Sequence, residues 1–445
     1  MKPIFEDEKI FLEENLGVKL PNNCWRDGKK IYLNSDKESF VIQFRVEHKK
    51  IIITKNKLEE VVSKIKNKTF EEEVIENKTR LDNLEKESIE KTIEFINRYP
   101  NNEIRISHSG GKDSDVMWHI LQKVFEEMEI DNYVIDFFNT TNDTAQTYLH
   151  VKMDLPREHL QINNPKKGWY EWLKRDKNYY LPSVMVRNCC STYKEGQVKK
   201  ILDKNKNYII FLGARKYESA KRSKYDWDLN EAWLKANPNK KLNMPSNWQR
   251  FLPIVNFTDV DIWLYILREN IKINPMYKLG FNRTGCLLCP YSSDYTDLLI
   301  EKHYPLHWDR WCSIVETNYD LYDVKTRLKW SKEEYIQEGK WKQATSKEQD
   351  LITKKATPER IKELAKLKGV SEEVAAKYFK KECSCGKKLN PDEIAMFLKL
   401  MGRYEGVEDN RVYLCKNCLC ELLGITKEEY AEKVREFRSQ GCNLF

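Results

Sequence analysis

The hydrophobic pattern between residues 100 and 300 alternates between short apolar runs and longer amphipathic segments. It predicts strands at residues 104–107, 133–138 and 208–212, and helices at residues 114–128 and 143–152. Strands that alternate with helices are typical of a parallel sheet with helices on both faces. We therefore expect an α/β fold here, with a doubly wound parallel sheet that binds ligands beyond the carboxyl ends of its strands.

The segments on either side follow other patterns. Alternating runs at residues 40–46 and 51–54 predict a hairpin with a charged tip. Thr258, Thr357 and Ser371 each precede acidic positions and predict helix starts. The whole pattern predicts five segments: a small α+β N-terminal domain at 1–57, a charged helical connector at 58–99, the α/β domain at 100–300, a helical segment at 301–379 and a cysteine-rich metal module at 380–445.

The composition indicates a soluble protein. Of the 445 residues 33% are charged, the net charge is +8, and the mean hydropathy is −0.72. No apolar run approaches the roughly 20 residues that span a bilayer, and the first residues are too acidic for a signal peptide. We therefore expect a cytoplasmic protein with no membrane partner. Lysines alternate with acidic residues along much of the chain, so the charge permits nucleic-acid binding without requiring it.

The twelve cysteines fall mostly into close groups. The groups are Cys189-Cys190, Cys286-x-x-Cys289, Cys383-x-Cys385 and Cys415-x-x-Cys418-x-Cys420, while Cys24, Cys312 and Cys442 stand alone. In a chain without an export signal, such groups favour metal or redox chemistry over a disulfide scaffold.

The hexapeptide Ser109-Gly110-Gly111-Lys112-Asp113-Ser114 lies between a predicted strand and a predicted helix. Its glycines let the backbone turn sharply and approach an anion, and the start of the helix offers unpaired N–H groups to phosphate oxygens. Lys112 adds a positive charge, and the two serines add hydroxyl donors. The spacing matches neither a Walker loop nor the G-x-G-x-x-G motif. The sequence therefore predicts a phosphate site of another type.

Ser-Gly-Gly-x-Asp-Ser after a strand resembles the PP-loop of the ATP pyrophosphatase (adenine nucleotide alpha hydrolase-like) superfamily, whose members split ATP between the α and β phosphates. Further motifs follow in order: Arg187 to Lys194 with its cysteine pair, Gly213 to Ser219, Pro253 to Trp263, Asn274 to Tyr277, and Gly285 to Pro290. The ordered set resembles the phosphoadenosine phosphosulfate (PAPS) reductase family over roughly residues 100–300. The resemblance implies the PP-loop, HUP-like form of the doubly wound sheet.

In iron–sulfur members of that family, a vicinal cysteine pair and a later Cys-x-x-Cys bind a [4Fe-4S] cluster. The resemblance therefore implies that Cys189, Cys190, Cys286 and Cys289 bind such a cluster. Four thiolates from two short loops suit the four corners of a cubane cluster. A structural zinc site with the same ligands is an alternative, because Cys-x-x-Cys is also a zinc-binding spacing, and free thiols are a third.

The intact loop separates this chain from the reductases of the family, whose degenerate loop lacks Gly-Gly-Lys. The resemblance then implies ATP with Mg²⁺ as ligand, and Lys112, Asp113 and Ser114 as catalytic residues. Asp113 is either a magnesium ligand or a cap for the next helix. Arg215 either holds phosphate or is a solvated surface charge. The residues implied to bind the nucleotide are Ser109, Gly110, Gly111, Lys112, Asp113, Ser114 and Arg215.

The C-terminal cysteines form a second candidate metal site. Two chelating pairs separated by twenty-nine residues are typical of a zinc ribbon or treble-clef-like module. We expect Zn²⁺ to be held by Cys383, Cys385, Cys415 and Cys418. Cys420 is an alternative ligand, and a second iron–sulfur site is an alternative to zinc. Such modules stabilise a small domain or contact a partner, often nucleic acid.

Together these features predict an enzyme: a PP-loop ATP pyrophosphatase that splits ATP to AMP and pyrophosphate and activates a substrate for sulfur transfer. The sulfur-inserting members that it resembles act on DNA or tRNA, and the sequence leaves the acceptor and the sulfur donor open. One alternative is a PAPS or adenylyl-sulfate reductase that releases sulfite and uses Cys442. Another is a zinc-containing accessory protein that binds nucleic acid. Lys166 to Trp172 mixes cations with aromatic residues, as a base-stacking surface or a packed amphipathic helix would.

Overall fold

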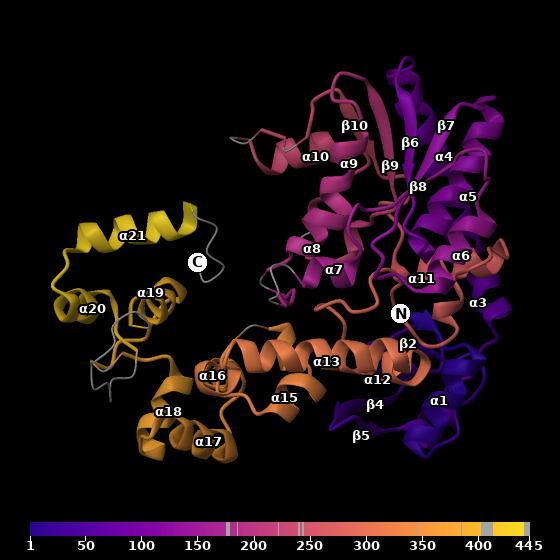
Figure 1. Cartoon of the computed structure of the whole chain (residues 1–445). Helices are drawn as coiled ribbons and strands as arrows, with labels where there is room; N and C mark the ends of the chain where they lie inside the picture. Colours follow the sequence, from indigo (N-terminus) through magenta and orange to yellow (C-terminus); the bar gives the residue numbers. More distant parts are fainter. Residues whose placement is uncertain are drawn as a thin grey trace. The chain divides into compact units, whose positions relative to one another are not determined.

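The computed structural model describes two compact units (Figure 1). The first comprises Met1–Pro182 and Val186–Val315, and the second comprises Ser183–Met185 and Glu316–Phe445. The finer division into five segments stays a prediction. The described residues are 1–174, 179–184, 186–220, 222–238, 241–242, 244–343, 345–383, 385–401 and 413–439.

A five-stranded parallel sheet forms the centre of the first unit. Its strands are β6 (Glu103–Ser107), β7 (Tyr133–Phe138), β8 (Leu160–Asn163), β9 (Tyr208–Leu212) and β10 (Trp248–Phe251), in the order β10-β9-β6-β7-β8. The predicted doubly wound parallel sheet is therefore confirmed. β8 and β10 are additional edge strands, and each is only four residues long.

Helices flank both faces of this sheet: α4 (Lys78–Arg98) and α5 (Lys112–Glu127) pack on one face, and α9 (Gly196–Ile201) packs on the other (Figure 1). Val116, Ile120, Leu121 and Val124 of α5 recur at helical spacing and are buried in one core with the strand residues. The helices of this part are α4 (Lys78–Arg98), α5 (Lys112–Glu127), α6 (Ala145–Asp154), α7 (Trp169–Leu173), α8 (Asn188–Cys190), the π-helical turn η2 (Ser191–Glu195), α9 (Gly196–Ile201), α10 (Leu229–Ala236), α11 (Asp259–Arg268), α12 (Asp294–His303) and α13 (Pro305–Leu321), which continues into the second unit.

An antiparallel sheet at the N-terminus belongs to the same unit. Its strands, in sheet order, are β1 (Lys2–Pro3), β2 (Trp25–Asp27), β3 (Lys30–Tyr32), β4 (Phe40–Glu47) and β5 (Lys50–Asn56), accompanied by α1 (Glu6–Leu16), α2 (Leu58–Val62) and α3 (Phe70–Glu76). Glu47 pairs with Lys50, which confirms the predicted hairpin and its tip. Trp25 and Tyr32 share one hydrophobic core with the parallel sheet, so the two sheets fold together.

The second unit is helical and has a core of its own, which includes Leu364, Met396 and Leu419. The hydroxyls of Thr357 and Ser371 accept N–H groups three residues on, which confirms these helix starts. Its helices are α14 (Val324–Arg327), α15 (Lys332–Gln337), α16 (Lys347–Thr353), α17 (Pro358–Lys368), α18 (Glu372–Lys380), α19 (Pro391–Met401), α20 (Lys416–Leu423) and α21 (Lys427–Ser439). In the part of the chain that the structure describes, no helix combines the length and the apolar character needed to cross a bilayer.

Candidate functional site

The Ser109–Ser114 loop follows β6, where the progress of the chain across the sheet reverses. From β6 the chain moves to β7 and β8 on one side, and later to β9 and β10 on the other. In open α/β sheets this reversal opens a ligand-binding crevice at the carboxyl ends of the two central strands. The segment after β9 brings Arg215 to the same crevice, in contact with Asp113, which precedes it by 102 residues.

Two glycines give this loop its shape. Gly110 has a φ of +71°, in the left-handed region that favours glycine, and a Cβ there would lie 2.9 Å from Cγ2 of Thr147. A Cβ at Gly111 would lie 2.7 Å from Oγ1 of Thr284. A side chain at either position would collide with the surrounding structure, so the close packing of the loop requires both glycines.

Helix α5 starts within this hexapeptide, at Lys112, with Gly111 as its N-cap and no side chain that caps it. The N–H groups of a first helical turn lack intrahelical partners, and the helix dipole makes this end positive. The N–H of Lys112 donates to the phenolic oxygen of Tyr277 at 3.0 Å. The hydroxyl oxygens of Ser109 and Ser114 lie 2.9 Å apart at the same end. This arrangement can take up an anion such as phosphate.

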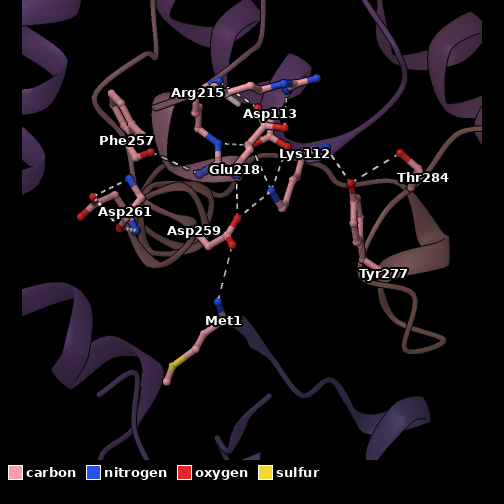
Figure 2. Close-up of polar contacts among 12 residues, drawn as sticks. Met1, Lys112, Asp113, Arg215, Glu218, Phe257, Asp259, Asp261, Tyr277 and Thr284 are labelled. Atoms are coloured by element: carbon pink, nitrogen blue, oxygen red, sulfur yellow. Dashed lines mark hydrogen bonds and ion pairs between the residues drawn. The ribbon is translucent and has the colours of Figure 1, made fainter. Parts of the chain in front are cut away.

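Two cations and two carboxylates meet beside the loop (Figure 2). Nζ of Lys112 lies 2.8 Å from Asp113 and 3.4 Å from Asp259. Arg215 donates from Nε to Asp113 and from Nη2 to Asp259, each at 2.6 Å. Asp113 therefore makes ion pairs instead of capping α5. Arg215 is only 2% exposed and is not a solvated surface charge. The amino group of Met1 also lies 3.7 Å from Asp259.

The opposite charges of this network keep Asp259 and Arg215 ionised. Burial alone would raise the pKa of the Asp259 carboxyl, but the positive charges of Lys112 and Arg215 outweigh burial and lower the pKa to about 2. Burial alone would lower the pKa of the Arg215 guanidinium, but the negative charges of Asp113 and Asp259 raise it. Asp259 and Arg215 are therefore both charged at neutral pH.

Asp259 is a site residue that the sequence pattern did not single out. It is the first residue of α11, next to the predicted N-cap Thr258. The structure confirms that cap, because the N–H of Asp261 donates to the Thr258 hydroxyl at 3.2 Å. An acidic residue directly after an N-cap is ordinary at a helix start, so the sequence holds no signal for a second role of Asp259.

Residues 274–286, which we name the bridging segment, lie across the phosphate loop. Nδ2 of Asn274 donates to the carbonyl of Gly110 at 2.9 Å. Oγ1 of Thr284 donates to the same carbonyl at 3.3 Å. Two residues beyond Thr284 the segment ends at Cys286. It therefore connects the loop directly with one of the predicted cluster ligands.

Arg26 of β2 anchors the bridging segment to the N-terminal sheet. Its guanidinium is 1% exposed and donates to the carbonyl of Gly280 at 2.6 Å and to Oδ1 of Asn282 at 2.7 Å. Its Nε donates at 2.5 Å to Glu8, a fully buried carboxylate that also pairs with Lys2. Burial alone would raise the pKa of Glu8, but the charges of Arg26 and Lys2 lower it. The N-terminal sheet is therefore part of the scaffold that positions the site.

The fold brings the four predicted cluster cysteines together. The pKa of the Cys189 thiol is raised, first by its hydrogen bond to Cys190, then by burial and by the charges of Cys190, Cys286 and Cys289. The hydrogen bond from Cys189, together with the positive charge of Lys194, lowers the pKa of Cys190 to about 6. The Cys189-Cys190 pair of α8 and the Cys-x-x-Cys after the bridging segment thus lie close enough for their charges to interact.

This cysteine site lies at the same edge of the sheet as the phosphate loop. The Cys286 thiol lies 3.6 Å from Oγ1 of Thr140 and donates to it. The N–H of Leu287 donates to the carbonyl of Asn142 at 2.6 Å. Thr140 follows β7, which is the direct neighbour of β6. Because the carboxyl ends of neighbouring parallel strands share one edge, the cysteines are placed beside the nucleotide crevice.

A second set of cysteines lies in the C-terminal unit. Its ligand atoms all lie within 4.8 Å of one another, and the set consists of Cys383, Cys385, Cys415 and Cys418. The sulfurs of Cys385 and Cys415 are 3.9 Å apart, close to the roughly 3.8 Å expected between thiolates around a tetrahedral zinc. The N–H of Cys415 donates to the Cys383 sulfur at 3.1 Å. Cys420 lies outside this set, and its thiol donates to the carbonyl of Thr426.

Two further sequence predictions concern the Lys166 to Trp172 segment and Cys442. Trp169 and Trp172 of α7 are buried and pack around Tyr193, as in a packed amphipathic helix. Cys442, the residue on which the reductase alternative depends, lies outside the described residues.

Comparisons with known proteins cover the parallel-sheet part of the chain. The model of the phosphoadenosine phosphosulfate reductase domain matches residues 103–292. An uncharacterised protein of Methanocaldococcus jannaschii is 27% identical over 254 residues, which cover 56% of this chain and 56% of that protein. Sulfate adenylyltransferase subunit 2 of Vibrio vulnificus is 30% identical over 224 residues, which cover 45% of this chain and 67% of the relative.

A second uncharacterised protein of Methanocaldococcus jannaschii also matches. The chain spans about half the length of these two relatives, 56% of the first and 51% of the second. A crystal structure of PAPS reductase from Candida auris superimposes on 46% of this chain and 93% of that chain, with a TM-score of 0.33 and 15% identity. The family model matches the part of the chain that carries the ordered loop and cysteine motifs. The Vibrio relative is 30% identical, with 67% of its length covered, and so agrees with the same family. The chain therefore belongs to the PAPS reductase family, within the PP-loop (adenine nucleotide alpha hydrolase-like) superfamily.

Proposed function

We propose that this protein is a PP-loop ATP pyrophosphatase, which splits ATP into AMP and pyrophosphate and activates a substrate for sulfur transfer. The observation that carries the proposal is the convergence of Lys112 and Arg215 with the first-turn N–H groups of α5 at the reversal point of the sheet. The Vibrio relative is named for adenylyl transfer, a class of reaction in which an acceptor attacks the α phosphate and pyrophosphate leaves.

In the proposed reaction an acceptor oxygen forms a bond to the α phosphorus while the bond from that phosphorus to the bridging oxygen breaks. Pyrophosphate leaves with the bonding electrons, so negative charge grows on it. Lys112, Arg215 and the first-turn N–H groups are placed to stabilise this charge, with Ser109 and Ser114 as further donors. Loss of one preorganised donor of this kind costs about 3 kcal/mol of activation free energy. A sulfur nucleophile then displaces AMP from the acceptor.

The two carboxylates of the network have a role in the same proposal. Asp113 and Asp259 balance the charges of Lys112 and Arg215 while no phosphate is bound. A triphosphate would take over the two cations and release carboxylate oxygens, which are the ligands that Mg²⁺ prefers. Asp113 and Asp259 would then hold Mg²⁺, which neutralises phosphate charge.

We also propose a [4Fe-4S] cluster on Cys189, Cys190, Cys286 and Cys289. Among the described residues, the C-terminal set is the only group of three or more metal-binding side chains whose ligand atoms lie within 4.8 Å of one another. No three sulfurs of the other four cysteines meet this limit, which favours a larger cluster over a single zinc ion as their ligand. The cluster would add electron-transfer or sulfur chemistry beside the nucleotide.

The compact C-terminal set supports Zn²⁺ as its metal, since its sulfur spacing matches a tetrahedral site. For the acceptor we propose a nucleic acid, DNA or tRNA, which is the substrate class of the sulfur-inserting members of the superfamily. A cytoplasmic location stays a prediction.

Product analysis tests the ATP reaction. Purified protein incubated with ATP and Mg²⁺ should release AMP and pyrophosphate, and the Lys112→Ala variant should lose about 100-fold or more of this activity. Lys152→Ala is the matched control, because Lys152 is an exposed lysine on the neighbouring helix α6. Release of ADP in place of AMP would contradict the proposal.

Metal analysis tests the two metal sites in one preparation. Anaerobically purified protein should contain iron and sulfide with the broad visible absorption of an iron–sulfur cluster, together with zinc. Cys286→Ala should lose the iron and keep the zinc, while Cys312→Ala, which changes a cysteine outside both sets, should keep both. Zinc in place of iron at the first set would refute the cluster.

Reduction of an activated sulfate is the second candidate function, because the matching family model describes a phosphoadenosine phosphosulfate reductase domain. Sulfite released from adenylyl sulfate or PAPS in the presence of a thiol reductant would favour it. Loss of that release in Cys442→Ser, with ATP cleavage absent from the parent protein, would establish it over the pyrophosphatase.

A further inference from the structure

Positive charge is concentrated in one short stretch of the C-terminal unit. Residues 354–388 contain eleven Lys or Arg against five Asp or Glu, an excess of six, while the whole chain has an excess of eight. Most of the net charge of the protein thus lies in α17, α18 and the loop that carries the first two cysteines of the metal set. A run of this length is a candidate electrostatic contact surface.

The packing of α18 leaves its lysines in solvent. Ala375 and Tyr378 face the core of the unit, and Lys377 and Lys380 are exposed. Lys381 follows at the C-cap, so spacings of three and four residues place these lysines on neighbouring parts of the helix surface.

The cysteine loop adds a fourth lysine at the same end of α18. Glu382 and Lys388 pair as an antiparallel bridge, and the N–H of Leu389 donates to the carbonyl of Lys381 at 3.1 Å. Lys388 is exposed and lies across this turn from Lys381. We name Lys377, Lys380, Lys381 and Lys388 the lysine surface.

None of these four lysines forms an ion pair with a described carboxylate. In the described part of the chain, no carboxylate lies within 4.0 Å of their ammonium groups. Neighbouring lysines differ, since Lys354 pairs with Asp350 and Lys368 pairs with Glu348. Lys387 pairs with Glu393 at 3.1 Å. Lys387 is therefore already in an ion pair, whereas no carboxylate of the described residues pairs with the lysine surface.

We propose that the lysine surface binds the phosphate backbone of a nucleic-acid duplex. Four exposed ammonium groups that no described carboxylate pairs, carried on one helix end and the adjoining loop, can each contact a backbone phosphate. Among the described residues of 354–388, no large hydrophobic side chain is exposed, so the surface offers nothing on which unpaired bases could stack. This inference deepens the proposed function and rests on it for the idea of a nucleic-acid acceptor. The binding itself is measurable without turnover.

Salt-dependent binding of the full-length protein tests the surface. Fluorescence anisotropy with a short DNA duplex and an RNA duplex of the same sequence gives the dissociation constant at several salt concentrations. Each neutralised phosphate contributes about 0.9 to the slope of log K against log salt. Changing all four lysines to glutamine should lower the slope by about 3 to 4 and weaken binding about tenfold or more at 0.1 M salt. The comparison of the two duplexes decides whether DNA or RNA is preferred.

A charge-matched control separates this surface from general electrostatics. Lys64, Lys66, Lys91 and Lys235 are exposed lysines of the first unit that are already paired with carboxylates. Changing these four to glutamine gives the same loss of charge and should leave the slope nearly unchanged. Equal losses in the two variants, tighter binding of a single strand than of a duplex, or no duplex binding by the parent protein would each overturn the proposal.

Metal content and ATP cleavage complete the test. The lysine-surface variant should keep its zinc and its release of AMP and pyrophosphate from ATP, because none of its four positions belongs to the nucleotide crevice. If the parent protein binds duplexes but does not split ATP, the proposed reaction fails and the surface stands. If it splits ATP but binds no duplex, the surface fails and the proposed reaction stands.

Discussion

The phenolic oxygen of Tyr277 accepts the backbone N–H of Lys112 at 3.0 Å, on the first residue of helix α5. The Tyr277 side chain is buried, and its oxygen also lies 3.4 Å from Oγ1 of Thr284. A phosphate oxygen at a helix N-terminus takes this same position. The protein therefore supplies an oxygen of its own to the loop, and a nucleotide that uses the Lys112 N–H has to replace it.

Removing this oxygen should strengthen nucleotide binding. Tyr277→Phe keeps the ring and frees the Lys112 N–H, so a phosphate no longer competes with an internal hydrogen bond. Since such a bond contributes about 0.5 to 1.5 kcal/mol net, ATP should bind roughly 2- to 10-fold more tightly. Isothermal titration with a non-hydrolysable ATP analogue measures the change. Weaker binding would mean that the Tyr277 hydroxyl itself contacts the nucleotide.

Neutralising Asp259 should strengthen the binding of pyrophosphate but slow the cleavage of ATP. Asp259→Asn leaves Lys112 and Arg215 with one carboxylate fewer, so inorganic pyrophosphate should bind more tightly. The variant also loses a proposed magnesium ligand, and kcat for ATP cleavage should fall about 10- to 100-fold. Steady-state kinetics over a range of Mg²⁺ concentrations measures both effects. Asp294→Asn, which changes a carboxylate paired with Lys29 outside the crevice, should change neither.

Asp259 should also make the stability of the folded protein fall as the pH is lowered from about 4 toward 2. The folded pKa of Asp259, about 2, lies below its ordinary value of 3.8. Its ionised form therefore stabilises the folded state above about pH 4, and this contribution disappears as the pH falls toward 2. The urea midpoints of the parent and Asp259→Asn should differ at neutral pH and converge in acid. A difference that stays constant over this range would show that the charge of Asp259 is not responsible.

Loss of Arg26 should destabilise the first unit and disturb the site. Arg26→Met leaves Glu8 fully buried with Lys2 as its remaining partner, and breaking a buried pair in this way costs about 3 to 5 kcal/mol. Urea unfolding followed by tryptophan fluorescence measures the loss. Lys19→Met breaks the ion pair of an exposed lysine with Glu13, and it should leave the urea midpoint nearly unchanged because solvent screens such pairs. Similar midpoints for the two variants would exclude Arg26 as the anchor of the bridging segment.

Zinc should be required for the folding of the C-terminal unit. Cys383→Ser removes one ligand of the compact set and should reduce the zinc content from one ion per chain to nearly none, with helix loss by circular dichroism. Cys420→Ser changes a nearby cysteine whose thiol bonds the carbonyl of Thr426, and it should keep the metal. Retention of zinc by Cys383→Ser would point to a different ligand set.

Local sequence predicted the elements that depend on neighbouring residues. The short run that contains Ile104 and Ile106 identified β6, and the helical spacing of Val116 and Ile120 identified α5. Both could be recognised because the spacing of apolar residues along an element reflects which of its faces is buried. Thr258 identified the start of α11, because a cap bonds an N–H only three residues away. β8 and β10 gave no such signal, since each is four residues long and includes polar positions.

The sequence by itself determined the place of the phosphate loop, the three central strands β6, β7 and β9, the helices that follow β6 and β7, and the grouping of the cysteines. Only the tertiary structure decided which distant residues complete the site. Asp259 meets Lys112 across 147 positions, and Arg26 meets Gly280 across 254. The physical reason is that an ion pair or a hydrogen bond requires two groups within a few ångströms, and for such pairs that distance is set by strand order and by the packing of the two sheets.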